Sequence, residues 1–218
     1  MERIKNLILP KGLPVTFTVF YAVGLVLFAV NETRSLFFYI TPFTLLLVAF
    51  AVFYYHKEYN IKLIIAFLTI FLASFTIEAI GVATGKLFGS YNYLSTLGIK
   101  IFDTPILIGI NWLLLIYCSR ALITETTKSP ILKILGGSLL MVFYDLVLEI
   151  AAPIMKMWEF KGTYPPFQNF LMWFIVSLAF HSLLSVLNIN IKNRPARYLF
   201  IIQILFFALI IFFDKLFN

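Results

Sequence analysis

Apolar stretches of about twenty residues, separated by short polar segments, follow one another along the whole chain. About 20 apolar residues span the hydrocarbon core of a bilayer as a helix. The pattern therefore predicts an all-α fold, a polytopic transmembrane helix bundle of about seven spans, of which the last is the shortest. Six spans with a peripheral tail is the alternative. The predicted spans cover residues 13–30, 36–55, 63–83, 105–123, 131–153, 167–189 and 198–213.

The composition agrees with an integral membrane protein. Of the 218 residues, 61% are hydrophobic and only 12% are charged, and the mean hydropathy is +0.97. The first apolar run is followed by no small-residue cleavage site, so we interpret it as a retained helix. No repeat or linker divides the chain, and we expect residues 1–218 to form a single integral membrane domain.

The distribution of Lys and Arg predicts a cytoplasmic N-terminus, because the side of the membrane richer in these residues stays in the cytoplasm. This arrangement also accounts for the net charge of +7 without a nucleic-acid partner, and none is expected. The predicted inner segments hold Arg3, Lys5, Lys11, Lys57, Lys62, Arg120, Lys128, Lys133, Lys192, Arg194 and Arg197, and the outer segments hold Arg34, Lys86, Lys100, Lys156, Lys161 and Lys215.

Three carboxylates lie within predicted spans: Glu78, Asp145 and Glu149. Each ionisable group near the bilayer centre costs roughly 2.5 to 3.5 kcal/mol, so three such groups indicate a function. Asp145 and Glu149 are four residues apart and face the same side of a helix. Two carboxylates that close in an apolar pocket cannot both ionise cheaply, so one should keep its proton near neutral pH. A neutral acid beside a carboxylate is an acid/base pair.

Two other interpretations of these acids stay open at this stage. Lys156 or Lys161 could reach in from the following loop and pair with them. Alternatively, Asp145 and Glu149 could bind a divalent cation that holds a diphosphate, as in membrane prenyltransferases, although such sites usually need a second acidic motif. The single cysteine, Cys118, excludes a thiolate metal cluster and is expected to serve in packing. We expect no metal and no cofactor.

The two informative connections, residues 84–104 and 153–166, are predicted to face the same outer side of the membrane. Gly81, Gly85 and Gly89 recur every four residues and should share a helical face with Glu78, where small residues let another backbone approach closely. His181 is predicted to lie too far from the acids to act with them and to have a buried structural role.

Aromatic and amide side chains concentrate near the predicted outer ends of the helices. They are candidates to line a groove for a flat, apolar substrate, and aromatic faces also stabilise cations. Asn111 is a candidate to hydrogen-bond a water or an acid. The predicted substrate-binding residues are Tyr91, Tyr93, Asn111, Trp112, Trp158, Tyr164, Asn169 and Trp173.

Over roughly residues 63–175 the chain resembles the membrane carotenoid biosynthesis proteins of the bisanhydrobacterioruberin hydratase (carotenoid 1',2'-hydratase) type. The segment from Glu78 to Trp112 is the most specific part of this resemblance, and the acidic pair with the aromatic loop after it is the second. The residues that carry it are Glu78, Gly81, Gly85, Gly89, Tyr91, Tyr93, Gly98, Pro105, Trp112, Asp145, Glu149, Trp158, Asn169 and Trp173.

The resemblance implies a hydro-lyase that adds water, without a cofactor, to the terminal double bond of an acyclic carotenoid, giving a tertiary alcohol. By this interpretation Asp145 is the general acid, Glu149 orients the water as base, and Glu78 is a second candidate acid. The lipophilic carotenoid would enter from the bilayer of a bacterial or archaeal cell membrane, and contact with other carotenoid enzymes is possible.

Two alternative functions remain. A membrane lycopene-type cyclase also protonates a polyene end, but a neighbouring double bond captures the cation in place of water. A small proton-coupled transporter would use buried acids to move protons, and it predicts a polar pathway across the whole membrane. The sequence favours an enzyme, because the acids gather toward one side and the inner halves of the helices look apolar.

Overall fold

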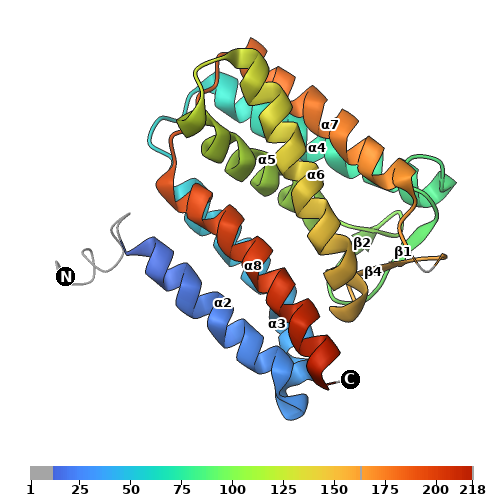
Figure 1. Ribbon diagram of the computed structural model, residues 1–218. Helices are drawn as coiled ribbons and strands as arrows, with labels where there is room; N and C mark the ends of the chain where they lie inside the picture. The colour runs from blue at the N-terminus through green and yellow to red at the C-terminus, as the bar shows by residue number, and fades with distance from the viewer. Residues whose placement is uncertain (1–11, 163, 218) are drawn as a thin grey trace.

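The computed structural model describes residues 12–162 and 164–217, and within them it forms a bundle of seven helices with two small sheets at one end (Figure 1). The predicted all-α membrane bundle is confirmed. The helices are α2 (Leu13–Ala29), α3 (Asn31–Tyr54), α4 (Ile61–Thr84), α5 (Leu107–Thr126), α6 (Pro130–Ile154), α7 (Phe167–Val186) and α8 (Arg194–Phe217). The strands are β1 (Tyr91–Tyr93), β2 (Lys100–Ile101), β3 (Thr104–Pro105) and β4 (Trp158–Phe160).

Six of these helices are long and apolar enough to cross a membrane, and α2, with 17 residues, is the shorter seventh. The prediction that the last span is the shortest was wrong, since α8 has 24 residues. α8 extends beyond the predicted span at both ends, where charged residues lower the hydropathy of the sequence. Arg197, near the start of α8, forms an ion pair with Glu125 at 3.2 Å, and Lys215 lies in the last turn.

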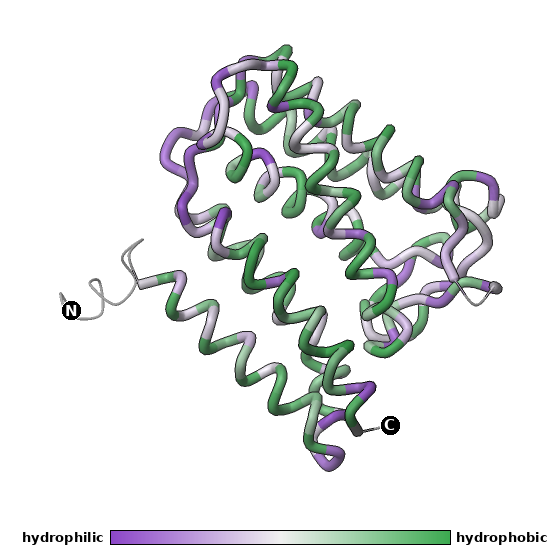
Figure 2. The backbone as a smooth tube through the Cα atoms, in the orientation of Figure 1, coloured by the Kyte–Doolittle hydropathy of each residue, from purple (hydrophilic) through white to green (hydrophobic). Residues whose placement is uncertain are grey.

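Alternate connections lie at opposite ends of the bundle. The α3–α4, α5–α6 and α7–α8 connections lie at one end, and the α2–α3 turn and the sheets lie at the other (Figure 1). Hydrophilic segments concentrate at these two ends, with apolar helix between them (Figure 2). Arg3, Lys5 and Lys11, which contribute to the charge count, lie outside the described residues. The cytoplasmic N-terminus therefore stays a prediction.

Two of the predicted inner charges are buried inside helices. Arg120 lies within α5 and Lys133 within α6, and both are buried, at 2% and 8% exposed. The α5–α6 connection is only three residues long, because Ser129 caps the N-terminus of α6 directly after α5 has ended at Thr126. The charge pattern thus overestimated the length of this loop.

α5 lies at the centre of the bundle. Every residue from Trp112 to Ala121 is buried, and α5 packs against α3, α4, α6, α7 and α8. Cys118 is fully buried among them, in agreement with a packing role. An enclosed helix of this kind gives a rigid support for Asn111 and Trp112 near its N-terminal end.

The predicted glycine face does not continue along a helix. α4 ends at Thr84 because Gly85 adopts a left-handed conformation (φ 65°), and its N–H group bonds to the Gly81 carbonyl oxygen at 2.8 Å. Gly89 has φ 99° and lies in the following loop, where an added Cβ would lie 2.5 Å from Pro166 Cγ. The glycines therefore permit a helix end and close loop packing, not the approach of a second helix backbone.

Gly109 provides a test of the packing between α4 and α5. A Cβ at this position would lie 2.8 Å from the backbone carbonyl oxygen of Phe71 on α4. We expect Gly109→Ala to lower the free energy of unfolding by about 1 to 3 kcal/mol, measured as a lower melting temperature of the purified protein in detergent. The control is Gly162→Ala, because a Cβ at Gly162 would meet nothing closer than Tyr164 O at 3.7 Å. Equal melting temperatures for both variants would contradict this packing.

Candidate active site

The α4–α5 and α6–α7 connections are joined by a short antiparallel ladder. β1 pairs with β4 in a register that places Tyr91 opposite Phe160 and Tyr93 opposite Trp158. Because side chains alternate across a strand, these four aromatic residues share one face, while Asn92 and Glu159 face away and are exposed. The four aromatic side chains of the ladder therefore face the ends of α4, α5, α6 and α7. Both segments were predicted to be loops, so this ladder was not expected.

Glu78 lies on α4 beneath this ladder and is 5% exposed. Its Oε2 atom accepts hydrogen bonds from the hydroxyl groups of Tyr91 at 2.5 Å and Tyr93 at 2.9 Å. Its Oε1 atom accepts a third bond from the indole nitrogen of Trp112 at 2.8 Å. Burial raises the pKa of both tyrosines, and the Glu78 carboxylate raises it further. Both hydroxyl groups therefore stay protonated and able to donate.

Asp145 and Glu149 are bridged by one amide group. Asn169, at the start of α7, donates from Nδ2 to Asp145 Oδ2 at 2.8 Å and to Glu149 Oε1 at 3.0 Å. The indole nitrogen of Trp158 donates to Glu149 Oε2 at 3.0 Å. Asp145 is 0% exposed, and its Oδ1 atom has no hydrogen-bond partner in the described part of the chain. The pair thus has one free carboxyl oxygen.

The donors to the three acids are neutral side chains. They are two tyrosines, two tryptophans and one asparagine. The proposed reach of Lys156 toward the acids is not seen, because its Nζ lies 5.0 Å from the centroid of the Phe38 ring. Lys161 is exposed, and its backbone N–H group bonds to Ser90 O at 2.9 Å in extension of the ladder.

A cavity of about 20 Å³ lies between Glu78 and Glu149, and both side chains line it. A buried water needs roughly 10 to 15 Å³ of such space, so the cavity has room for about one water molecule. Asp145, the expected general acid, is not among the lining residues. The other lining residues are Phe88, Tyr91, Tyr93, Ile108, Asn111, Trp112, Trp158, Phe160, Asn169 and Trp173.

Most of the predicted site residues thus gather around one cavity. Tyr164 is 81% exposed and lies away from it. Phe88 and Phe160 line it but were not predicted. The position of Phe160 two residues after Trp158 was a signal for a shared strand face, whereas nothing in the sequence indicated that Phe88 folds back onto Gly81, whose added Cβ would lie 2.7 Å from the Phe88 ring.

A second group of buried polar side chains lies toward the other end of the bundle, so the expectation of apolar inner helix halves was wrong. His181 is fully buried, with Nε2 3.3 Å from Ser119 Oγ. Arg120 donates from Nη2 to Ser185 Oγ at 2.9 Å. None of these four residues lines the acid cavity. Among residues 12–162 and 164–217, no three His, Cys, Asp or Glu side chains are placed to hold a metal ion.

Fold and site together define a multi-pass helical membrane protein with carboxylates held by neutral donors around a small aromatic cavity. A family model of carotenoid biosynthesis proteins matches residues 38–216, and the chain belongs to this family. The match covers every helix that carries the site and supports a role in carotenoid biosynthesis as a biosynthetic enzyme. Comparison with curated proteins and with solved structures gives no match.

The bond from Trp112 to Glu78 Oε1 provides a test of the site geometry. Trp112→Phe keeps an aromatic ring but removes the indole N–H donor. We expect the free energy of unfolding to fall by about 1.5 to 3 kcal/mol, the usual contribution of a hydrogen bond to a charged group, measured as thermal unfolding in detergent. Tyr39→Phe, at a side chain that is 73% exposed, serves as the control. A variant as stable as this control would contradict the bond.

Proposed function

We propose that the protein adds water to the terminal double bond of an acyclic carotenoid and produces a tertiary alcohol. The observation that carries this proposal is that Glu78 and Glu149, from two helices, line one aromatic cavity with room for about one water. Hydration of an alkene needs a proton donor, a proton acceptor and a single positioned water. The cavity brings side chains suited to each of these tasks together.

The reaction proceeds in two steps. A carboxylic acid transfers its proton to the less substituted carbon of the double bond, and the π electrons form the new C–H bond and leave a tertiary cation. The oxygen of the water then forms a C–O bond to this cation, and a carboxylate accepts the proton that the water loses. One molecule of water is added in total, and no oxidant, reductant or cofactor is needed.

Glu149 is the proton donor in this proposal, and Asp145, which lies farther from the cavity, returns a proton to Glu149. Glu149 lines the cavity, whereas Asp145 does not. The Asn169 amide holds the two carboxyl groups next to one another, so a proton shared by the pair can move to Glu149 after each transfer. This assignment differs from the one made from the sequence, which gave the donor role to Asp145 and the base role to Glu149.

Glu78 is the base. It accepts three hydrogen bonds on its two oxygens, and an ionised carboxylate has the lone pairs for such a number of donors. Its negative charge also lies across the cavity from Glu149, where it would stabilise the tertiary cation. The stacked rings of Trp112 and Trp173, with centroids 4.3 Å apart, add an aromatic wall that tolerates a cation.

The surroundings of the site fit a substrate that arrives through the bilayer. A carotenoid is insoluble in water, and the residues that line the cavity include side chains of α4, α5, α6 and α7, all of which are apolar enough to cross a membrane. We propose that the protein acts as a single membrane domain in the cell membrane of a bacterium or archaeon. Other carotenoid enzymes would supply its polyene and consume its alcohol.

The roles of the acids can be tested in a bacterium that makes lycopene. With the wild-type chain we expect a pigment heavier by one water, measured by chromatography and mass spectrometry. Glu149→Gln, Glu78→Gln and Asp145→Asn should each lower its yield by about a hundredfold or more, the usual contribution of a general acid or base. Glu159→Gln is the matched control, because this carboxylate lies on β4 beside Trp158 but is exposed.

Each other outcome of this experiment has a definite meaning. An isomeric pigment of unchanged mass would contradict hydration and indicate that the protein is a cyclase. Unaltered lycopene, with the protein present in the membrane, would contradict hydration of this substrate. Full activity of the Glu149→Gln variant would refute its role as the proton donor.

The source of the added atoms gives a second test. In water enriched in oxygen-18 we expect the new hydroxyl group to carry the heavy oxygen, and in heavy water we expect one deuterium on the neighbouring carbon. Mass spectrometry of the purified product measures both labels. A new hydroxyl group without heavy oxygen would derive from molecular oxygen, which would identify an oxygenase and rule out the acid/base mechanism.

A further inference from the structure

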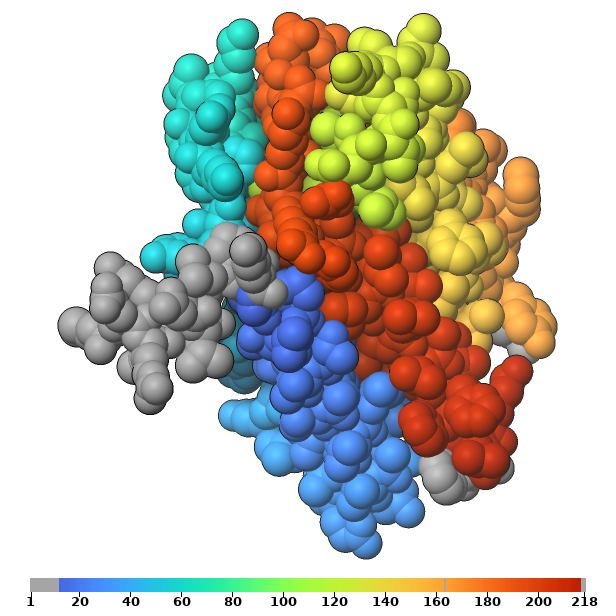
Figure 3. Space-filling view, turned by 60° about the vertical axis from the view of Figure 1, so that its left-hand side comes forward, coloured from blue at the N-terminus to red at the C-terminus, as the bar shows by residue number. Residues whose placement is uncertain are grey.

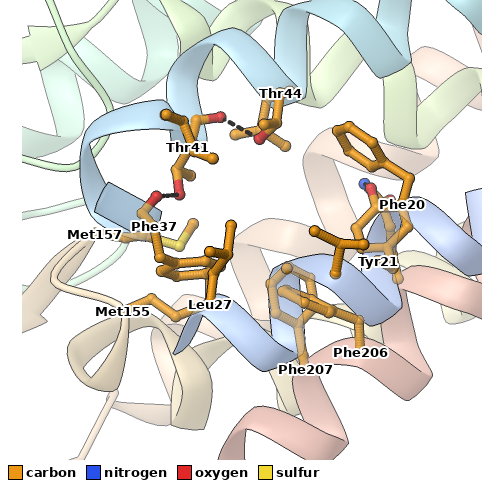
Figure 4. A pocket seen from close by; sticks show the side chains of 15 residues that line it. Phe20, Tyr21, Leu27, Phe37, Thr41, Thr44, Met155, Met157, Phe206 and Phe207 are labelled. Carbon is orange, nitrogen blue, oxygen red and sulfur yellow. Dashed lines mark hydrogen bonds between the residues drawn. The ribbon is translucent and has the colours of Figure 1, made fainter. Parts of the chain in front are cut away.

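A second and larger cavity, of about 100 Å³, lies between α2, α3, α8 and the loop after α6. Side chains from all four segments point into it (Figure 4). Five aromatic rings and two methionines form much of its wall. The rings belong to Phe20, Tyr21, Phe37, Phe206 and Phe207, and the methionines are Met155 and Met157.

The few polar groups around this cavity are bonded to protein atoms. Thr41 donates from its hydroxyl group to Phe37 O at 2.7 Å, and Thr44 donates to Thr41 O at 2.8 Å, as Figure 4 shows. Gln203 donates to the Tyr21 hydroxyl group at 2.9 Å. Both threonine hydroxyl groups thus bond to backbone carbonyl oxygens of α3, and their methyl groups are left to line the cavity. A long hydrocarbon fits such a surface better than a polar ligand.

The cavity reaches the lipid-facing surface of the bundle. α2 packs against both α3 and α8, and α2 and α8 lie side by side along one face (Figure 3). Val23 of α2 lines the cavity and is 54% exposed. An apolar chain can therefore extend from the bilayer into the cavity past α2.

A third cavity, of about 10 Å³, shares lining residues with both this space and the acid site. It shares Leu45, Met157 and Phe207 with the large cavity. At its other end it shares Ile108 and Asn111 with the cavity of Glu78 and Glu149. Three cavities thus follow one another from the lipid-facing surface to the carboxylates, with a narrow middle section.

Met157 and Trp158 join the two ends of this series. They are neighbours in the chain, yet Met157 lines the large and the middle cavities, whereas Trp158 lines the acid cavity and bonds to Glu149. The side chain of Met157 is unbranched and adapts readily to its surroundings. It lies where the narrow section begins, so a change of its rotamer can widen the path.

We propose that the cavity between α2, α3 and α8 binds the polyene chain of the substrate and that the middle cavity guides the chain end to Glu78 and Glu149. This inference rests on the proposed function and names the part of the protein that recognises a long, flat hydrocarbon. The five rings contact the conjugated chain, Asn111 lies where the end group enters the acid cavity, and the remainder of the chain lies in lipid.

A photoreactive probe and a cavity-filling variant test this site. The probe is a farnesyl chain that carries a benzophenone, a group that labels methionine readily, and peptide mass spectrometry locates the label. We expect labelling of Met155 and Met157 in the purified protein, with displacement by lycopene. Gly24→Leu should remove the labelling, because a Cβ at Gly24 would already lie 3.4 Å from the Phe206 ring and the larger side chain fills the cavity.

The same variant separates chain binding from chemistry. We expect Gly24→Leu to lower lycopene hydration by about tenfold or more but to spare the hydration of β-farnesene, a short terpene with the same end group. Thr44→Leu, which fills the cavity from α3, is a second variant should Gly24→Leu not fold. Val19→Leu is the matched control, because Val19 lies on α2, is 57% exposed and does not line the cavity.

Three results would overturn the inference. The first is wild-type lycopene hydration in both cavity-filling variants. The second is labelling that phospholipid displaces but lycopene does not, which would make the cavity a site for a lipid acyl chain. The third is an equal loss of hydration activity toward lycopene and β-farnesene in the Gly24→Leu variant. If the wild-type protein hydrates neither compound, the proposed function fails, whereas labelling that lycopene displaces still supports a polyene site.

Discussion

The structure depends on one constraint: buried carboxyl groups need hydrogen-bond donors from the protein where no bulk water is present. Every buried polar group in a bilayer needs a partner from the protein, since hydrocarbon offers none. Glu78, Asp145 and Glu149 find theirs in tyrosine, tryptophan and asparagine side chains, and several of these donors come from the loops that carry β1 and β4. The loops are therefore held over the helix ends by the same bonds that hold the acids. Fold and site are one arrangement in this region.

The ladder of β1 and β4 explains how two separate loops come to share one site. Its register brings Tyr93 beside Trp158, and these two residues donate to carboxylates on different helices, α4 and α6. Backbone bonds continue the pairing on both sides, from Leu94 N to Met157 O at 2.9 Å and from Lys161 N to Ser90 O at 2.9 Å. A change in one loop must therefore alter the hydrogen bonds to both Glu78 and Glu149.

Hydropathy alone predicted the helix bundle, and the spacing of Asp145 and Glu149 predicted that they share a face. The sequence could not show that Asp145 lies behind Glu149, because this depends on where Asn169 enters from α7. It also could not predict the ladder, since strands of three residues carry too little pattern. The end of α4 agrees with the predicted span, but the predicted helical face of Gly81, Gly85 and Gly89 was wrong, because a four-residue glycine spacing fits a helix face and a left-handed turn equally well.

The chain has three tryptophans, and all three line the acid cavity. Membrane proteins commonly place tryptophan in the belts at the two water interfaces, but here the exposed aromatic side chains are of other kinds, among them Tyr39, Tyr54 and Tyr59. The tryptophan fluorescence of this protein therefore originates at one place. The native chain contains its own optical reporter of that site, and the spectrum responds to whatever enters the cavity without an added dye.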